Sequence, residues 1–306
     1  MSDLVHQGPT RARIFAPVGG ATLDWLARSR DEVLGELGAH GAVVVQGLRG
    51  GVDEFSDVVT ALGGTQLEYT ERSTPRSAVS GNVYTSTEYP ADQDIEMHNE
   101  NSYSDTWPTY LFFYCARAAT SGGETPIADS RGVLDRLPDH VRSKFEDGLV
   151  YTRVYREGLG LTWQEAFQTG NRDEVEKYCS AHGLEARWDG DSLSTSASRP
   201  ATRTAPSSGQ EVWFNQANLF HPSTLAPEVR DALTELYDDA GFPRNVYLAD
   251  GSPIKDADIH TISEAFRSSS LAMPWEVDSV MIIDNMRMAH GRKAFRGDRR
   301  ILVAMT

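Results

Sequence analysis

Cysteine is nearly absent from this chain, since only Cys115 and Cys179 occur among its 306 residues. Two cysteines in a chain of this length cannot build the framework of several disulfide bonds that small secreted domains use. We therefore expect both thiols to be reduced, as is usual in the cytoplasm.

Long apolar runs are also absent. No segment approaches the roughly 20 consecutive apolar residues that a membrane-spanning helix requires. Residues 1–20 contain no apolar run behind a basic stretch, so we read no secretory signal there. The composition, 40% apolar and 24% charged, is that of a globular protein. These features predict a cytoplasmic protein with no membrane partner.

Positive charge is scarce, because 29 Lys and Arg against 44 Asp and Glu give a formal net charge of −15. Nucleic-acid-binding surfaces are usually basic, since neutralisation of phosphates supplies much of their affinity. The composition therefore argues against a nucleic-acid partner. An anionic ligand that enters so acidic a protein needs fixed positive charge at its site, which directs attention to individual arginines.

The hydrophobic pattern changes along the chain. Residues 21–64 read as helix, strand, helix, with apolar stripes at helical spacing on either side of the short apolar run 42–45. Beyond residue 78, short strand-like runs alternate with Gly, Pro and Ser turns, and helices return later. The further elements predicted from these patterns are strands at 78–87, 110–117, 211–215, 279–284 and 300–305, helices at 161–182, about 226–240 and about 256–268, and a loop at 188–210.

This order of elements predicts a mainly β protein with added helices. A β-sandwich or barrel would carry an α/β flank over about residues 1–77 and a large helical and loop insertion over about 131–210. No repeat or linker divides the chain, so we predict a single domain over residues 1–306.

The central chemical feature is the triplet His98-Asn99-Glu100. In a strand, residues two apart point to the same face, so an imidazole and a carboxylate would meet at one point. Two histidines and one carboxylate on one face of a ferrous ion leave positions open for a cosubstrate and O2. His290, in a predicted turn after the strand that ends at Asp284, is the best third ligand. Taken alone, the triplet could equally be a surface or core histidine that a neighbour satisfies.

The surroundings of these residues resemble the taurine dioxygenase/TfdA superfamily, and more narrowly the branch that includes clavaminate synthase and the syringomycin-cluster hydroxylase. The resemblance covers about residues 80–306 and implies a double-stranded β-helix core (jelly-roll, cupin-like). It rests on the order and spacing of four segments, which are His98-Asn-Glu-Asn-Ser-Tyr103, Gly122-Gly-Glu-Thr-Pro-Ile-Ala-Asp129, Asp284-Asn-Met-Arg-Met-Ala-His-Gly-Arg292 and Arg299-Arg-Ile-Leu302.

The resemblance implies an Fe(II)- and 2-oxoglutarate-dependent dioxygenase that uses O2 and releases succinate and CO2. His98, Glu100 and His290 would be the iron ligands. Thr125 would bind a 2-oxoglutarate carboxylate, and Arg300 would pair with the distal carboxylate, because a guanidinium matches a carboxylate bidentately. Arg299 is the alternative arginine, and alternation along the strand places it on the opposite face.

Two departures from the taurine enzyme bear on the substrate. That enzyme has Asp where this chain has Glu100, as the clavaminate branch does, and a halogenase of the superfamily would have a small residue there. The taurine enzyme also has a second arginine, four residues after the first, that binds the substrate sulfonate. Here that position is Ala304, which disfavours a sulfonate.

We expect the substrate to be an amino acid or amino-acid derivative, free or tethered to a carrier protein, in specialised-metabolite biosynthesis. Asp94 and Glu96 would share the strand face of His98 and could meet a substrate cation, although solvated acids at a strand end are the alternative. The other candidates are residues that could line the pocket or meet a carboxylate or phosphopantetheine arm, but that could equally lie on the surface: Tyr84, Ser86, Arg153, Arg156, Arg199 and Arg203.

Three alternative functions remain open on the sequence. The same cofactors could support desaturation, epoxidation or cyclisation of another small molecule. A zinc-type ion on the same ligands could support a hydrolase or isomerase, which would have no need of Thr125 and Arg300. A binding protein could also keep the fold without catalysis.

Overall fold

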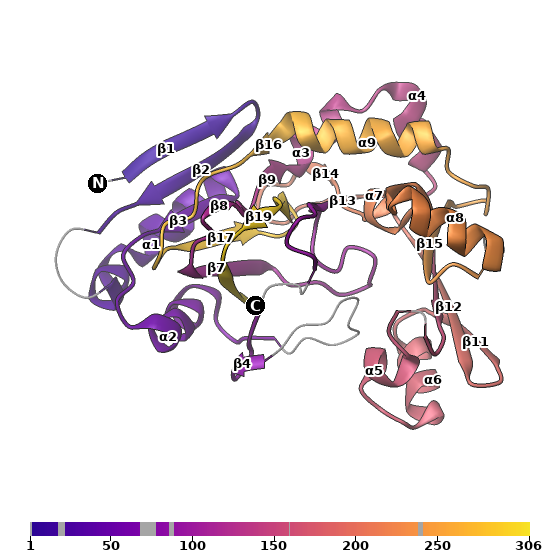
Figure 1. Cartoon of the computed structure of the whole chain (residues 1–306). Coiled ribbons are helices and arrows are strands. Elements are labelled where there is room, and N and C mark those ends of the chain that lie inside the picture. The colour runs from indigo at the N-terminus through magenta and orange to yellow at the C-terminus, as the bar shows by residue number, and fades with distance from the viewer. Residues whose placement is uncertain (1, 18–21, 68–77, 86–88, 159, 238–240) are drawn as a thin grey trace.

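The centre of the computed structural model is an eight-stranded sheet in which strands from both ends of the chain lie side by side (Figure 1). The structure describes residues 2–17, 22–67, 78–85, 89–158, 160–237 and 241–306. In spatial order the strands are β1 (Ser2–Gln7), β2 (Thr10–Phe15), β3 (Ala42–Val45), β17 (Val280–Asp284), β7 (Tyr110–Arg117), β20 (Arg300–Met305), β5 (Val83–Thr85) and β4 (Ala78–Ser80).

A four-stranded sheet packs against one face of this large sheet. Because both faces of the large sheet are covered at its centre, the central strands β3, β17, β7 and β20 read as continuous apolar runs rather than alternating ones. Ile301 and Val303 of β20 pack towards the small sheet, where Ile127 and Met288 meet them in one cluster. In spatial order the small sheet contains β16 (Ser270–Leu271), β9 (Ile127–Asp129), β18 (Met288–Arg292) and β6 (Ile95–His98).

Helices cover the outer faces of both sheets. α1 (Thr22–His40) and α2 (Gly51–Gly63) place apolar stripes on the large sheet, against residues such as Leu302. α9 (Asp256–Ser269) and α3 (Ser130–Arg136) cover the small sheet, where Phe266 packs in one cluster with Ala289. The site described below therefore lies between two sheets that are each braced from outside.

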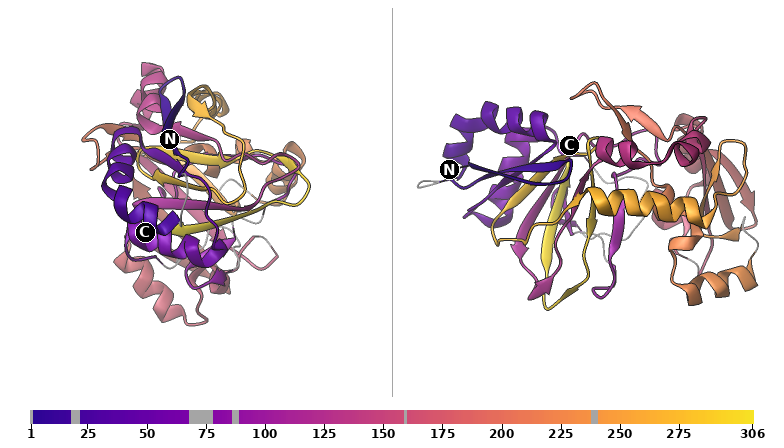
Figure 2. Two further views of the ribbon diagram at one scale, coloured as in Figure 1. Left: turned by 90° about the vertical axis from the view of Figure 1, so that its left-hand side faces the viewer. Right: turned by 90° about the horizontal axis from the view of Figure 1, so that it is seen from above.

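The segment between β9 and β17 adds a third sheet at the end of the molecule away from α1 and α2 (Figures 1 and 2). Its strands in order are β11 (Glu185–Asp189), β12 (Ser192–Arg199), β10 (Leu149–Tyr155) and β15 (Arg244–Leu248). The shorter elements are α4 (Asp139–Arg142), η1 (Ser143–Phe145), α5 (Trp163–Phe167), α6 (Arg172–Ala181), α7 (Ala217–Phe220), η2 (Pro222–Thr224), α8 (Pro227–Leu236) and the ribbons β13 (Thr202–Thr204) with β14 (Glu211–Trp213) and β8 (Ser121–Gly122) with β19 (Phe295–Arg296).

The predicted fold class is confirmed, but the loop predicted at 188–210 is wrong. That stretch contains the whole of β12, in which Leu193, Thr195 and Ala197 are buried and the serines between them are not. Buried and less buried residues alternate along this strand with a period of two. The sequence does not show this alternation clearly, because its Ser and Thr residues are typical of loops. The insertion is thus as much strand as helix, and its limits within a single domain remain a prediction.

Two predictions from composition can be compared with the structure. Cys115 and Cys179 are buried and form no disulfide bond with each other. Among the helices of the described residues, none combines the length and the apolar character needed to cross a membrane.

Candidate metal centre and its cavity

Two antiparallel strands of the small sheet place His98 and His290 directly opposite each other. Side chains of such cross-strand pairs start about 5 Å apart, and here the ring centroids are 4.4 Å apart. Met97 and Ala289, their neighbours in sequence, point the other way, into the core under α9. Alternation in β6 and β18 therefore directs both imidazoles into the space between the sheets.

The prediction that His290 lies in a turn is wrong, because it lies in β18. The turn is shorter than expected and ends before Met288. The run Met-Ala-His-Gly-Arg has no β-branched residue and contains glycine, so its composition does not indicate a strand. Only its pairing with β6 and β9 makes it one.

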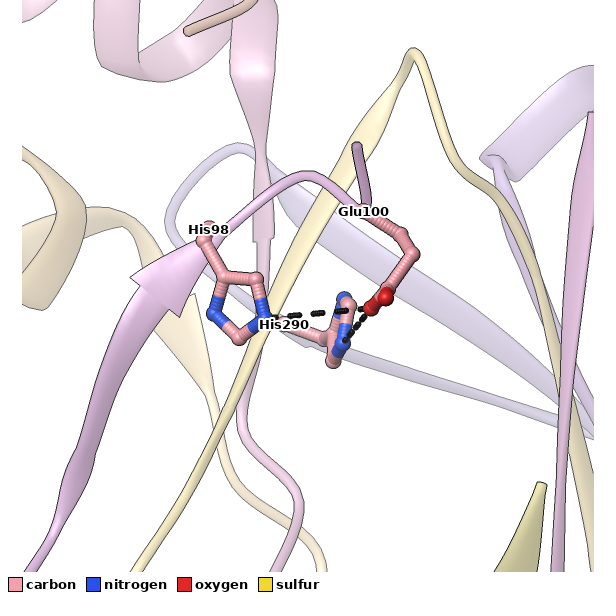
Figure 3. Close-up of side chains that lie close together, drawn as sticks. All are labelled: His98, Glu100 and His290. Carbon is pink, nitrogen blue, oxygen red and sulfur yellow. Dashed lines mark ion pairs between the residues drawn. The ribbon is translucent and has the colours of Figure 1, made fainter. Parts of the chain in front are cut away.

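Glu100 completes the cluster from just beyond the end of β6 (Figure 3). Its Oε2 lies 3.9 Å from Nε2 of His98 and 3.7 Å from Nε2 of His290. One candidate ligand atom from each residue lies within 4.8 Å of the others, and Glu100 is only 4% exposed. The chain thus brings together the three predicted ligands, although the carboxylate reaches the site through a turn rather than along a strand.

The donor set fits a ferrous ion. A buried carboxylate between two imidazoles requires a compensating positive charge, and a divalent cation supplies it. Nδ1 of His98 lies 2.8 Å from the carbonyl oxygen of Glu96, so a neutral imidazole donates there and turns the lone pair of Nε2 towards the carboxylate. Two imidazole nitrogens and one carboxylate oxygen are the ligands that non-haem iron prefers when positions must stay open.

Buried amide side chains fix the backbone that carries these ligands. Asn285 accepts a hydrogen bond from the backbone N–H of Glu100 (2.7 Å) and donates to the carbonyl of the same residue (2.9 Å). Gln216 donates to the carbonyl of Asn99 (2.7 Å), and Asn218 donates to the carbonyl of Met97 (2.9 Å). These contacts leave the ligand backbone little freedom, which favours a preformed metal site.

Gly291 allows β18 to approach β6 closely. A Cβ atom at this position would lie 2.7 Å from the carbonyl oxygen of Ile95 and 3.0 Å from the sulfur of Met97. We expect Gly291→Ala to separate the two strands, to lower the free energy of unfolding by about 1–3 kcal/mol, and to weaken iron binding. Thermal melts of the metal-free protein and iron titrations would measure both effects.

Gly35 provides a matched control for this prediction. It lies inside α1, and a Cβ atom there would have no neighbour within 4 Å. Gly35→Ala should leave iron binding unchanged and stabilise the helix by about 0.5–1 kcal/mol. Equal iron affinity in the wild type and Gly291→Ala would show that the close approach does not matter to the metal site.

A second polar cluster surrounds Thr125, two residues before the start of β9. Nη2 of Arg299 lies 3.3 Å from Oγ1 of Thr125, and Nε of Arg299 donates to the carbonyl of Gly123 (2.8 Å). The indole N–H of Trp275 also reaches Thr125 Oγ1, at 3.2 Å. Arg300, by contrast, is exposed at the start of β20. The structure therefore places Arg299, and not the predicted Arg300, beside Thr125.

The error has a physical cause. Alternation correctly separates the two arginines, but β20 is buried on both faces, so its sequence does not tell which face meets the site. Ile301 and Val303 pack between the sheets, whereas Leu302 and Ala304 pack towards the helices. Arg299 continues the first set. The position four residues after it is Val303, so the argument against a sulfonate is unchanged.

Arg299 is a cation held away from water. Burial, followed by the positive charge of Arg292, lowers the pKa of its guanidinium to about 10. In the described part of the chain it forms no ion pair with a carboxylate. A buried cation of this kind is favourable only when an anion joins it, so Arg299 and Thr125 suit one carboxylate of a dicarboxylic acid.

A cavity of about 300 Å³ opens beside the metal ligands and contains charges of both signs. His98 and Glu100 lie in its wall together with Glu96 and Arg244. Asp94 lies there too, but its carboxylate accepts hydrogen bonds from Lys293 (2.9 Å) and the backbone N–H of Ala294 (2.6 Å). Of the two predicted acids, Glu96 is thus the one whose carboxylate remains available to a ligand.

The other predicted substrate residues lie apart from this wall or cannot be placed. Tyr84 is buried between the sheets and pairs with Val303. Arg203 stacks on Trp107, 4.4 Å from the ring centroid, and is not among the described residues that line the cavity. Ser86 lies outside the described residues. The segment Pro243-Arg-Asn245 was part of the family resemblance, but Arg244 was assigned no role, because an arginine at a strand start gives no local signal of burial.

Comparisons with known proteins agree with this geometry. The family described as "Taurine catabolism dioxygenase TauD, TfdA family" matches residues 8–306. The dapdiamide synthesis protein DdaC of Enterobacter agglomerans is 38% identical over 99% of this chain and 92% of its own. The clavaminate synthase-like protein At3g21360 of Arabidopsis thaliana is 33% identical over 88% and 82%.

Solved structures show the same fold at low identity. PvcB of Pseudomonas aeruginosa superposes with a TM-score of 0.59 at 13% identity, over 99% of this chain and 90% of its own. A second PvcB structure, described as that of an Fe, alpha-ketoglutarate dependent oxygenase from an isonitrile synthetic pathway, gives 0.57 at 14% identity over the same shares. The chain belongs to the TauD/TfdA family of iron- and 2-oxoglutarate-dependent dioxygenases.

Proposed function

We propose that this dioxygenase hydroxylates an unactivated C–H bond of an amino acid or amino-acid derivative in specialised-metabolite biosynthesis. The observation that carries the proposal is the charged cavity into which His98 and Glu100 open, with Glu96 and Arg244 among the residues that line it. The similarity to DdaC, whose name places it in dapdiamide synthesis, supports the same class of substrate.

The ligand residues would have distinct roles. His98, Glu100 and His290 would hold the iron on one face and leave the other to 2-oxoglutarate and O2. Arg299 and Thr125 would anchor the distal carboxylate of 2-oxoglutarate, and the low polarity between the sheets would strengthen that ion pair. A hydrolase or isomerase has no use for this second anchor, which is why we favour the oxygenase.

The reaction balances with the cofactors named. Iron and 2-oxoglutarate, when bound, supply the oxidant that cleaves a C–H bond. One oxygen atom of O2 enters the substrate as a hydroxyl group, the other enters succinate, and CO2 leaves. The protein decides which hydrogen reacts by holding one carbon nearest to the metal. Desaturation or cyclisation would follow if the substrate lost the same hydrogen atom but did not then take up a hydroxyl group. No feature of the described cavity favours either of these outcomes.

Glu96 is suited to bind the ammonium group of the substrate. It lies two residues before His98 in β6 and lines the same cavity, so an ammonium group paired with it would lie close to the metal ligands. Among the described residues its carboxylate forms no ion pair and no hydrogen bond. We expect Glu96→Gln to raise KM for an amino substrate about 10-fold or more without changing KM for 2-oxoglutarate.

The experiment is a screen of free L-amino acids and N-acetyl-L-amino acids for substrate-dependent succinate release and a product heavier by one oxygen atom. The best free amino acid is then used with Glu96→Gln and with Glu235→Gln, an exposed residue of α8 that serves as the control. If no amino acid or derivative stimulates succinate release, the proposed substrate class is wrong. If Glu96→Gln leaves KM unaltered, the ammonium site lies elsewhere.

A further inference from the structure

Arg244 lies in the wall of the metal cavity without an anionic partner. It begins β15 and lines the same cavity as His98 and Glu100. Its guanidinium carbon is 5.8 Å from the ring centroid of Phe220. Within the described residues it forms no ion pair and donates no side-chain hydrogen bond. Arg244 is partly buried, and arginine is seldom withdrawn from water unless it is paired, so the position of this side chain requires an explanation.

A second arginine stands next to it. Arg153 of β10 is the direct cross-strand partner of Arg244, and its guanidinium lies 4.8 Å from the ring centroid of Tyr155. Burial, followed by repulsion from Arg153, lowers the pKa of the Arg244 guanidinium. Like charges directly opposite on paired strands destabilise a sheet. An anion that binds at Arg244 would reduce this cost.

The surroundings favour a carboxylate as that anion. The wall near Arg244 includes Phe220, Leu219 and Leu225, which exclude water and strengthen ion pairs. A guanidinium presents two parallel N–H groups that match the two oxygens of a carboxylate. In so acidic a protein, an anion that enters the cavity needs such a site to offset general repulsion.

We propose that Arg244, supported by Arg153, binds a free carboxylate of the substrate. The inference rests on the proposed function, because it takes the cavity to be the substrate site. With Glu96 for the ammonium group, the cavity would recognise both ends of an amino acid. An amino acid joined to a carrier through its only carboxylate would lack the required anion, so the proposal favours a free acid or one with a second carboxylate.

The test compares acids with their methyl esters. Free L-amino acids, N-acetyl-L-amino acids, the methyl esters of both sets and pantetheine 4′-phosphate are titrated into the wild type, Arg244→Met, Arg244→Lys and Arg187→Met. Arg187 is an exposed residue of β11 and serves as the control. Binding is measured by calorimetry on the metal-free protein and by the visible absorption of the anaerobic complex with Fe(II) and 2-oxoglutarate.

We expect at least one acid to bind the wild type roughly 10- to 100-fold more tightly than its ester. Arg244→Met should abolish this preference, Arg244→Lys should retain part of it, and Arg187→Met should retain all of it. The acid–ester comparison in the wild type and the lysine variant stands even where the methionine variant does not fold.

Several results would overturn the inference. One is that no acid binds more tightly than its ester, and another is that the preference survives in Arg244→Met. Selective, Arg244-dependent binding of pantetheine 4′-phosphate would instead assign the arginine to a carrier arm. Failure of the proposed function is separate, because it would appear as wild-type protein that neither forms the visible complex nor consumes 2-oxoglutarate, while calorimetry would still report on Arg244.

Discussion

Replacing His290 by alanine is expected to abolish stoichiometric iron binding and to lower turnover on the order of a thousandfold or more, because the metal contributes several kcal/mol to the reaction. His290 holds the site from β18, while His98 and Glu100 come from one short segment around the end of β6. Its loss leaves two ligands, and the cluster no longer closes around one point. Iron content, the visible absorption with 2-oxoglutarate and succinate release would measure the effect.

His260 offers the matched control for this change, since it is an exposed histidine of α9. His260→Ala should retain iron at the wild-type level. Circular dichroism and thermal melts of His290→Ala would show whether the sheets remain intact. If His290→Ala kept one iron per chain and normal turnover, the three residues would not be the metal centre.

The second large effect separates two adjacent arginines. We expect Arg299→Gln to raise KM for 2-oxoglutarate roughly 10- to 100-fold, because ion pairs and hydrogen bonds to a buried carboxylate are worth about 1.5–3 kcal/mol. Arg300→Gln should have little effect, since this residue is exposed at the strand start. Initial-rate measurements at varied 2-oxoglutarate would give both values.

Arg299→Lys sharpens the experiment. The lysine variant keeps the positive charge but loses the planar guanidinium group that contacts both Gly123 and Thr125. Its KM for 2-oxoglutarate should therefore lie between those of the wild type and Arg299→Gln. A larger loss in Arg300→Gln than in Arg299→Gln would restore the assignment made from sequence and contradict the geometry of β20.

The sequence predicted the parts of this protein that depend on local pattern. The strands at 110–117 and 300–305 match β7 and β20 residue for residue, because long apolar runs between turn residues carry a strong signal. The metal triad was also predicted, but from the resemblance of its surrounding segments to a known family, because the triplet alone is ambiguous. These features require no knowledge of how distant segments pack.

The features that sequence did not reveal depend on packing between distant segments. β18 is a strand only because β6 and β9 pair with it. Arg299 faces the site only because the opposite face of β20 is covered by helices. Arg244 becomes a partly buried cation only when β15 pairs with β10, which lies more than 80 residues earlier in the chain. None of these contacts produces a periodicity or a composition that can be recognised within a single segment of the sequence.

The hydrogen bonds from Gln216 and Asn218 to the metal strand have a consequence for engineering. Part of the cavity wall comes from residues 216–226 and from Arg244. Residues 216–226 form one continuous segment, which could be exchanged with the corresponding segment of a relative. The same segment, however, donates hydrogen bonds to the backbone carbonyl groups of Asn99 and Met97, which adjoin the metal ligands. A chimaera that transplants a foreign specificity loop must therefore retain these two amides, or the graft will disturb the iron along with the selectivity it was meant to alter.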